Sequence, residues 1–254
     1  MFTGMQMMGL CEGLEDRRLL SASLVAGVLT VKGTTSADSI VLSLVSGDST
    51  HLQVNLNSVT SAFAVSSITK IVVYDSSGND MIKVDNLFGV VPFGVCEKGG
   101  DGNDLLIGGN RIDALFGGLG DDELRGMAGS DLLAGGDGLD KLLGYAGNDS
   151  LLGGLANDLL DGGSGNDVLK GGLGDDLLKG AAGLDSLFGN DGLDQLYGEL
   201  DSDLLDGGDG NDTLDGGAAL DSLIGGLGSD DFVWDHLVEI IDKTVDDVLS
   251  STVA

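Results

Sequence analysis

The sequence predicts an all-β fold, an array of short strands joined by tight glycine turns, and three observations lead to this prediction. Forty-five of the 254 residues are glycine, and only one is proline. A nine-residue period runs from Gly99 to Val233 without an insertion. Before this period, apolar and polar residues alternate over short runs, which is typical of half-buried strands. The single proline excludes collagen, and the 42% hydrophobic content excludes a disordered chain.

The charge of the chain indicates the kind of partner that it binds. It has 42 acidic and 12 basic residues, a formal net charge of -30. Such a charge repels nucleic acids and anionic membranes, so neither is an expected partner. It also destabilises a compact fold through self-repulsion, so we expect a cationic partner. The sequence has no apolar run long enough for a transmembrane helix.

Residues 1–22 are interpreted as a leader or sorting segment. The short apolar run from Met7 to Cys11 has no basic residue before it, which is atypical of a secretory signal peptide. The segment "LEDRRLLSA" (Leu14 to Ala22) resembles the LEPRxLLS-type motif near the start of many bacterial secreted and surface proteins, with Asp16 in place of the proline. The resemblance implies an extracellular or cell-surface location. The alternative is a basic turn before the first strand.

Residues 23–98 are predicted to form a β-rich capping region. Five strand-like runs lie in it, at residues 27–33, 39–45, 51–56, 68–75 and 81–85. Two of the joints, "GTTSADSIV" and "DSSGNDMIK", carry Asp-x-Ile where the later repeats carry Asp-x-Leu. The segment therefore resembles degenerate coils of the same architecture.

Residues 99–233 consist of fifteen nine-residue units. Each unit has Gly at position one and Asp at position six, and position eight is Leu in every unit except the last, which has Phe232. The consensus GGxGxDxUx resembles the hemolysin-type, or RTX, calcium-binding repeat. This resemblance implies a right-handed parallel β-roll, a β-solenoid that binds Ca²⁺. Proteins of this kind are commonly exported unfolded and fold in external calcium.

Elementary geometry explains the spacing within one unit. The residues x-U-x form a short strand whose central side chain points to one face, so the position-eight leucines form the core. The tight reversal before each strand requires positive φ angles, which glycine adopts at little cost. If two units make one coil of eighteen residues, alternate units stack about 4.8 Å apart. The position-six aspartates then form two rows, one on each edge of the solenoid.

These rows are the predicted metal ligands. Neighbouring carboxylates at this spacing repel one another unless a cation lies between them. Carboxylates and backbone carbonyls form an all-oxygen site, which suits Ca²⁺ better than Mg²⁺ or Zn²⁺. Counting adjacent pairs gives seven sites on the first edge and six on the second, up to about thirteen ions. The first edge contains Asp104, Asp122, Asp140, Asp158, Asp176, Asp194, Asp212 and Asp230; the second contains Asp113, Asp131, Asp149, Asp167, Asp185, Asp203 and Asp221; the predicted carbonyl ligands are those of Gly99, Gly117, Gly135, Gly153, Gly171, Gly207 and Gly225.

The two edges are expected to differ in occupancy. On the first edge, positions two and four are glycine in every turn except at Asn190 and Ala156. Non-glycine residues make the turn conformation costlier, so we expect full occupancy on the first edge and partial occupancy on the second. On the second edge these positions hold Met127, Tyr145, Ala181, Glu199, Arg111, Asp201 and Ala219.

The leading functional hypothesis is a secreted or cell-surface protein that folds on binding calcium and has a structural or adhesive role. The alternative is a non-catalytic calcium-binding and secretion module of a hydrolase or toxin. No catalytic function is expected, because the sequence contains neither HExxH nor GxSxG. The two histidines are interpreted as a strand-face residue (His51) and a tail residue (His236), and the widely separated Cys11 and Cys96 argue against a soft-metal site.

The C-terminal tail and the outward faces of the sheets have open interpretations. The tail at 234–254 is either a cap or an export signal. An ice-binding face would show outward threonines, but only Thr213 lies at such a position.

One outward sheet face is largely apolar, and it either mediates self-association, is covered by the tail or the N-terminal strands, or meets a foreign surface. Its residues are Ala114, Phe116, Leu132, Ala134, Ser150, Leu152, Val168, Lys170, Ser186, Phe188, Leu204, Asp206, Ser222 and Ile224.

Overall fold

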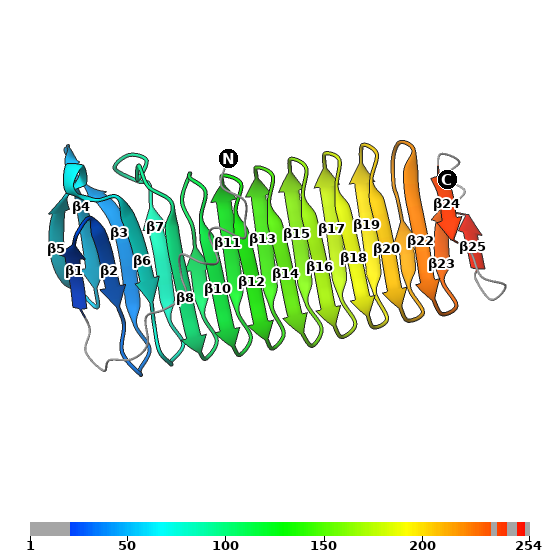
Figure 1. Ribbon diagram of the computed structural model, residues 1–254, viewed down its shortest axis with the longest axis horizontal. Helices are drawn as coiled ribbons and strands as arrows, with labels where there is room; N and C mark the ends of the chain where they lie inside the picture. Colours follow the sequence, from blue (N-terminus) through cyan, green and yellow to red (C-terminus); the bar gives the residue numbers. More distant parts are fainter. Residues whose placement is uncertain (1–20, 235–237, 243–247, 252–254) are drawn as a thin grey trace.

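The chain forms an elongated parallel β-solenoid in which two sheets face each other across a narrow core (Figure 1). This is a computed structural model, and it describes residues 21–234, 238–242 and 248–251. The predicted leader therefore lies almost entirely outside the described residues, as does His236. No α-helix occurs in the described ranges.

From β6 onward, successive strands of the chain alternate between the two sheets. Sheet A has twelve strands and sheet B has thirteen. In sheet A the strands are β1 (Ser21–Val25), β2 (Val28–Lys32), β6 (Lys70–Tyr74), β8 (Val95–Asp101), β10 (Ala114–Leu119), β12 (Leu132–Asp137), β14 (Ser150–Leu155), β16 (Val168–Leu173), β18 (Ser186–Asp191), β20 (Leu204–Asp209), β22 (Asp221–Leu227) and β24 (Val238–Asp242). In sheet B they are β3 (Ser39–Val45), β4 (Asp48–Leu56), β5 (Val59–Ala64), β7 (Met81–Asp85), β9 (Leu105–Ile107), β11 (Glu123–Ala128), β13 (Lys141–Ala146), β15 (Leu159–Ser164), β17 (Leu177–Ala182), β19 (Gln195–Leu200), β21 (Thr213–Asp215), β23 (Asp231–Trp234) and β25 (Val248–Ser251).

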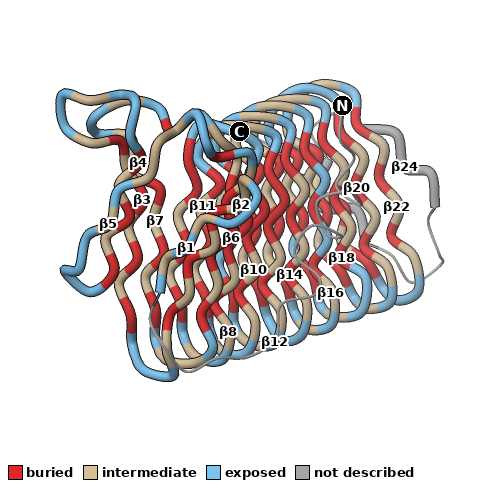
Figure 2. The backbone as a smooth tube through the Cα atoms, turned by 60° about the vertical axis from the view of Figure 1, so that its left-hand side comes forward, coloured by how far each residue is buried: buried red, intermediate tan, exposed pale blue. Residues whose placement is uncertain are grey.

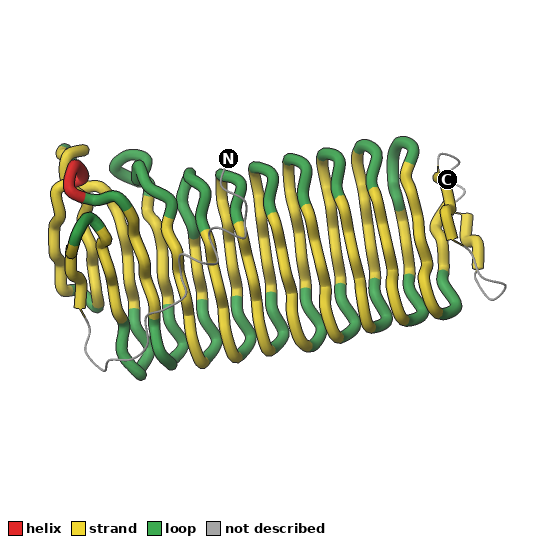
Figure 3. Tube along the Cα trace, viewed as in Figure 1, coloured by secondary structure: helices red, strands yellow, loops and turns green. Residues whose placement is uncertain are grey.

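The strand register confirms that two nine-residue units make one coil. Leu124 of β11 lies opposite Leu142 of β13, and Leu115 of β10 lies opposite Leu133 of β12, all in parallel pairs. Each partner is thus the same repeat position eighteen residues later. Turns alternate between the two edges along the whole array (Figure 3).

The core is a double stack of the position-eight side chains. From Leu106 to Phe232, every one of them is fully buried. Buried residues accordingly run along the length of the solenoid in Figure 2. Because large aromatic side chains are scarce, the two sheets pack closely on position-eight side chains that are all leucine except Phe232.

Antiparallel strands close the N-terminal end of the solenoid. Strand β1 pairs with β2, and β3, β4 and β5 form an antiparallel meander beyond the last parallel strand. The five predicted strand regions are confirmed, but β1 and β5 were missed. Both lie at a sheet end and are partly exposed, so they lack the strong alternation of buried apolar residues that identifies central strands. A short 3-10 turn at Val65–Ser67 connects β5 to the next coil.

The last two described strands continue both sheets at the C-terminal end. Strand β24 pairs in parallel with β22, and β25 pairs in parallel with β23. The described parts of the predicted tail are therefore strands of the solenoid, an arrangement that favours the interpretation of this segment as a cap.

One acidic residue interrupts the apolar stack. Glu97 of β8 occupies the core position between Val73 and Leu115 and is fully buried. Neither of its carboxyl oxygens has a hydrogen-bond partner. Burial, together with the charge of Asp113, raises the pKa of Glu97 well above its usual value. Burial therefore favours the protonated form of this carboxyl.

Candidate metal centres at the two edges

The position-six aspartates lie at the turns, at the start of each strand. First-edge turns, which carry the row from Asp104 to Asp230, lead from sheet A to sheet B. Second-edge turns, which carry the row from Asp113 to Asp221, lead back to sheet A. All fifteen side chains are buried, with exposed fractions of 4% or less. Burial of so many carboxylates in two rows requires compensation from donors or cations.

One oxygen of each carboxylate holds successive coils together. The backbone N–H of Asp104 donates to Oδ1 of Asp122 at 2.7 Å, and that of Asp122 donates to Oδ1 of Asp140 at 2.8 Å. On the second edge, the N–H of Asp131 donates to Oδ1 of Asp149 at 2.7 Å. The ladder continues along both edges at the same eighteen-residue spacing. Sequence reasoning assigned the aspartates to metal binding alone and missed this structural role.

The other oxygen, Oδ2, remains available for a ligand. It is buried and accepts no hydrogen bond in Asp104, Asp122, Asp131, Asp140, Asp149, Asp158, Asp167, Asp176, Asp185, Asp194, Asp203 and Asp212. A buried carboxylate oxygen without a donor is costly, and a bound cation removes that cost.

The position-one glycines leave the space into which these oxygens point. A Cβ placed on Gly117 would lie 2.1 Å from Oδ2 of Asp122 and 2.7 Å from the carbonyl oxygen of Gly135, one coil further on. Both oxygens therefore face the same small space, which any side chain would fill. The carbonyls of Gly135, Gly171, Gly207 and Gly225 are placed in this way. For Gly99, Gly117 and Gly153, the carbonyl ligand remains a prediction from the sequence.

Carbonyl oxygens at positions two and four face the next coil as well. A Cβ on Gly118 would lie 2.0 Å from the carbonyl oxygen of Gly100, and one on Gly120 would lie 2.3 Å from that of Gly102. Sequence reasoning explained these glycines by their φ angles and did not predict the carbonyls as further candidate ligands. The recurrent spacing of glycines in the repeats could have indicated these carbonyl contacts, because a close approach between two backbones also requires glycine.

The φ angles agree with the prediction that turns on the second edge are costlier to form. Asn190 and Ala156 on the first edge have φ angles of 78° and 75°. Left-handed φ values are also found on the second edge at Met127, Tyr145, Ala181, Glu199, Asp201 and Ala219. A left-handed residue other than glycine is strained, so the second edge carries more strained turns.

The turn that contains Arg111 departs from the common geometry. Neither Gly109 nor Arg111 has a positive φ angle. Instead, the N–H of Gly109 donates to Oδ2 of Asp113 at 2.6 Å. The oxygen that accepts no hydrogen bond in the twelve aspartates named above is therefore engaged in this turn, and we expect a weak site or none at Asp113.

A second ladder runs along the position-five side chains. The N–H of Asn166 donates to Oδ1 of Asn148 at 3.0 Å, and Oδ1 of Asn166 accepts from the N–H of Leu184 at 3.0 Å. Asn103 and Asp121 continue the same pattern on the first edge. These side chains are exposed, and the repeat consensus leaves position five undefined, so the sequence provided no signal for this role.

Among the described residues, no sulfur or imidazole ligand contributes to the two rows. Cys96 is buried in β8 and is not a free thiol, and Cys11 lies outside the described residues. His51 is exposed on β4, where its Nδ1 lies 2.7 Å from Oδ2 of Asp48. The interpretation of His51 as a strand-face residue is confirmed. The donors in the rows are carboxylate and carbonyl oxygens, the set that hard cations such as Ca²⁺ prefer.

A parallel β-solenoid with aligned rows of buried, open carboxylate oxygens at its turns defines a calcium-binding β-roll. The RTX calcium-binding nonapeptide repeat model matches four segments, residues 98–133, 134–169, 170–205 and 197–232, which together make up more than half of the chain. The chain belongs to this RTX calcium-binding repeat family. A search of the curated proteins finds no match. Within the described residues, no helix is long and apolar enough to cross a membrane.

Burial and mutual repulsion raise the pKa values of the aspartates in the rows. The pKa of Asp131 is raised to about 8 by burial and by the charges of Asp113 and Asp149. The pKa of Asp122 is raised to about 7 and that of Asp140 to about 6, in both cases chiefly by burial. In calcium-free protein, the folded roll therefore binds protons that the unfolded chain has released.

This shift predicts a pH dependence that calcium abolishes. Because the folded pKa values exceed the unfolded value of 3.8, the calcium-free roll should lose stability as pH rises from about 4 to about 8. Bound calcium keeps the same carboxylates ionised, as they are in the unfolded chain at neutral pH, so the stability of the calcium-saturated roll should change little near neutral pH. Circular dichroism at several pH values, in EDTA and in excess calcium, measures both trends. The same pH dependence in EDTA and in calcium would contradict the prediction.

Proposed function

We propose that the protein is a secreted or cell-surface β-roll whose folding is induced by calcium and whose role is structural or adhesive. The observation that supports the calcium dependence is the row of buried Oδ2 atoms without hydrogen-bond donors. The neighbouring carboxylates of each row repel one another until cations bind in the turns. Calcium then supplies folding free energy, because the sites do not exist in the unfolded chain.

The same chemistry and the family support the proposed extracellular location. Extracellular calcium modules bind with dissociation constants of about 10⁻⁴ to 10⁻³ M, so a chain of this kind remains unfolded in low calcium and folds outside the cell. The LEPRxLLS-like segment is consistent with this location. Each edge places its candidate ligands at turns that join the two sheets, so bound calcium would stiffen the whole rod, as a structural or adhesive role requires.

Removal of calcium is expected to unfold the roll. The purified chain in excess EDTA at neutral pH should give a largely disordered far-ultraviolet circular dichroism spectrum, which should become β-rich as calcium is added. Magnesium at the same concentration serves as the control and should not replace calcium, because Mg²⁺ retains its water ligands. A fully β-rich spectrum in EDTA at neutral pH would overturn the proposal.

We also propose self-association through the outer face of sheet A. Most of the outward residues predicted there are half-buried, and Val168 and Lys170 are exposed. Ala114 and Leu132, which were predicted to face outward, are instead buried. Ala114 is a small residue that lies between Cys96 and Leu132 of the two flanking strands. The Nζ atoms of Lys98 and Lys170 lie 5.7 Å from the ring centres of Phe116 and Phe188, so cations cover part of the apolar surface.

Sedimentation of the calcium-loaded protein tests this second proposal. We expect a mass above that of the monomer at high concentration, and we expect the double variant Phe116→Lys and Phe188→Lys to remain monomeric with unchanged stability. Monomeric wild-type protein at the highest concentration would refute self-association through this face. A loss of stability in the double variant would instead indicate that part of the chain covers the face.

A further inference from the structure

The N-terminal cap contains a turn pair that lies outside the residues matched by the repeat family. Residues 33–38 and 75–80 each follow the positions of a repeat unit, with Asp38 and Asp80 at position six. The N–H of Asp38 donates to Oδ1 of Asp80 at 2.7 Å, and the N–H of Asp80 donates to Oδ1 of Asp104 at 2.8 Å. The first-edge ladder therefore extends two coils into the cap.

Asp75 distinguishes this turn pair from all the repeat units. Its N–H donates to the carbonyl of Lys98, and Tyr74 pairs with Lys98, so Asp75 occupies the position at which each repeat has its first glycine. The preceding coil retains glycine there, and a Cβ on Gly33 would lie 1.7 Å from Oδ2 of Asp75. The Asp75 side chain thus fills the small space that faces the position-six carboxylates.

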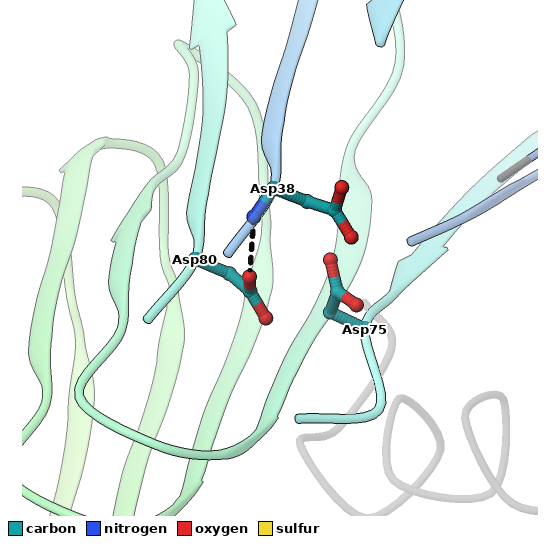
Figure 4. Close-up of side chains that lie close together, drawn as sticks. All are labelled: Asp38, Asp75 and Asp80. Atoms are coloured by element: carbon teal, nitrogen blue, oxygen red, sulfur yellow. Dashed lines mark hydrogen bonds between the residues drawn. The ribbon is translucent and has the colours of Figure 1, made fainter. Parts of the chain in front are cut away.

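Three carboxylates meet at this point. Ligand oxygens of Asp38, Asp75 and Asp80 all lie within 4.8 Å of one another, and the three side chains are 5%, 7% and 3% exposed. Figure 4 shows the carboxylate of Asp75 next to that of Asp38, and one oxygen of Asp80 accepting the backbone N–H of Asp38. Among the described residues, no Lys or Arg forms an ion pair with any of the three.

Hydrogen bonds account for only part of this cluster. Oδ2 of Asp38 accepts from the N–H and the hydroxyl of Thr34, at 2.6 and 2.9 Å, and its Oδ1 accepts from the Asn57 side chain. Oδ1 of Asp75 accepts from the N–H of Ser76 at 2.9 Å. The Oδ2 atoms of Asp75 and Asp80 are buried and accept no hydrogen bond. Two unpartnered oxygens on side chains that are more than nine-tenths buried therefore lie within the cluster.

We propose that Asp38, Asp75 and Asp80 form a three-carboxylate calcium site in the cap, and that this site binds calcium more tightly than the two-carboxylate sites of the repeat rows. The donors are all oxygen, which favours a hard cation. Calcium affinity increases with the number of charged ligands and with the rigidity of the site. This site has one more carboxylate than a site between two repeat turns, and antiparallel strands on its outer side hold it in place. Since it depends on the same carboxylate chemistry, the inference rests on the calcium-binding function proposed above.

The cap site is expected to fill first in a calcium titration. Burial and the neighbouring charges of Asp80, Asp38 and Asp104 raise the pKa of Asp75 to about 8 in the calcium-free state, so a shared proton between Asp75 and Asp80 is the competing explanation for the cluster. The two explanations differ in what Asp75→Asn does to calcium binding. This variant keeps the shape of the side chain and removes one charge.

Calcium competition against a chromophoric chelator, with the full chain, tests the assignment. Wild-type protein should show one tightly bound equivalent before the cooperative uptake by the rows. In Asp75→Asn, the dissociation constant of that equivalent should rise at least tenfold, and in Asp75→Gly, which restores the repeat residue, it should become equal to that of the rows. Asp101→Asn serves as the matched control, because Asp101 is an exposed aspartate of the neighbouring coil, and it should titrate like the wild type.

The outcomes separate this proposal from the proposed function. If all variants still fold in calcium and Asp75→Asn binds calcium as the wild type does, the cap site is refuted while calcium-induced folding stands. If Asp75→Asn changes only the pH dependence of the calcium-free protein, the cluster holds a shared proton, and the cap site is likewise refuted. If the wild type binds no calcium in the rows, the proposed function itself fails.

Discussion

Replacing Asp140 with alanine is expected to weaken calcium-dependent folding more than replacing Asp203 with alanine. The two side chains are closely matched: both are buried, at 3% and 4% exposed, and both accept a backbone N–H at 2.8 Å. The lost hydrogen bond and the lost burial are therefore equal. What differs is the turn around each carboxylate, and so the strength of the calcium site that is lost.

The first-edge turn at Asp140 has glycine at both left-handed positions, Gly136 and Gly138. The second-edge turn at Asp203 places Glu199 and Asp201 there, with φ angles of 74° and 69°. Left-handed conformations cost roughly 1–2 kcal/mol for such residues, so the Asp203 site is weaker before any mutation. Removing a carboxylate from a filled, buried site costs about 3–5 kcal/mol, which we expect for Asp140→Ala. We expect a smaller loss for Asp203→Ala.

Thermal unfolding in calcium and the calcium concentration at the folding midpoint measure this difference. The exposed position-three residue Asp137 provides the control, since Asp137→Ala removes the same charge from the same turn without removing a predicted ligand. Equal shifts for Asp140→Ala and Asp203→Ala would eliminate the predicted asymmetry between the edges.

Replacing Glu97 with leucine is expected to stabilise the protein. The side chain is fully buried in the apolar stack between Val73 and Leu115, and both of its carboxyl oxygens lack hydrogen-bond partners. An unsatisfied buried polar group costs about 1–3 kcal/mol, and leucine would extend the position-eight stack instead. Urea or thermal unfolding, with and without calcium, measures the gain.

The pH dependence of this gain identifies its cause. Since the folded-state pKa of Glu97 is raised, its contribution to stability falls as pH increases above the unfolded value of 4.5. The advantage of Glu97→Leu should accordingly be larger at neutral pH than near pH 4. Glu97→Gln is the matched control: it removes the ionisable group but retains unsatisfied polar atoms, so its gain should follow the same pH dependence and remain smaller than that of Glu97→Leu. A loss of stability in Glu97→Leu would show that the carboxyl has a partner or a function in the folded protein.

The sequence alone determined the repetitive part of the fold. A nine-residue period with Gly at position one, Asp at position six and Leu at position eight requires turns, edge carboxylates and a core at fixed positions, and the coil of two units follows from strand geometry. Residues such as Leu124 and Asp122 could be assigned in this way because each repeat provides the same local evidence. The left-handed φ angles at Glu199 and Asp201 were predictable for the same reason.

Only the tertiary structure decided the features that depend on how successive coils meet. The ladder from the N–H of Asp122 to Oδ1 of Asp140 and the insertion of Glu97 into the core between Val73 and Leu115 both join residues from different coils. Asp75 is the clearest example: in sequence it is one acidic residue in a degenerate repeat, and only the register of Tyr74 with Lys98 places it against Asp38 and Asp80. The repeat period determines which residues each turn contains. The contacts between irregular coils depend on how those coils stack, which no local sequence pattern specifies.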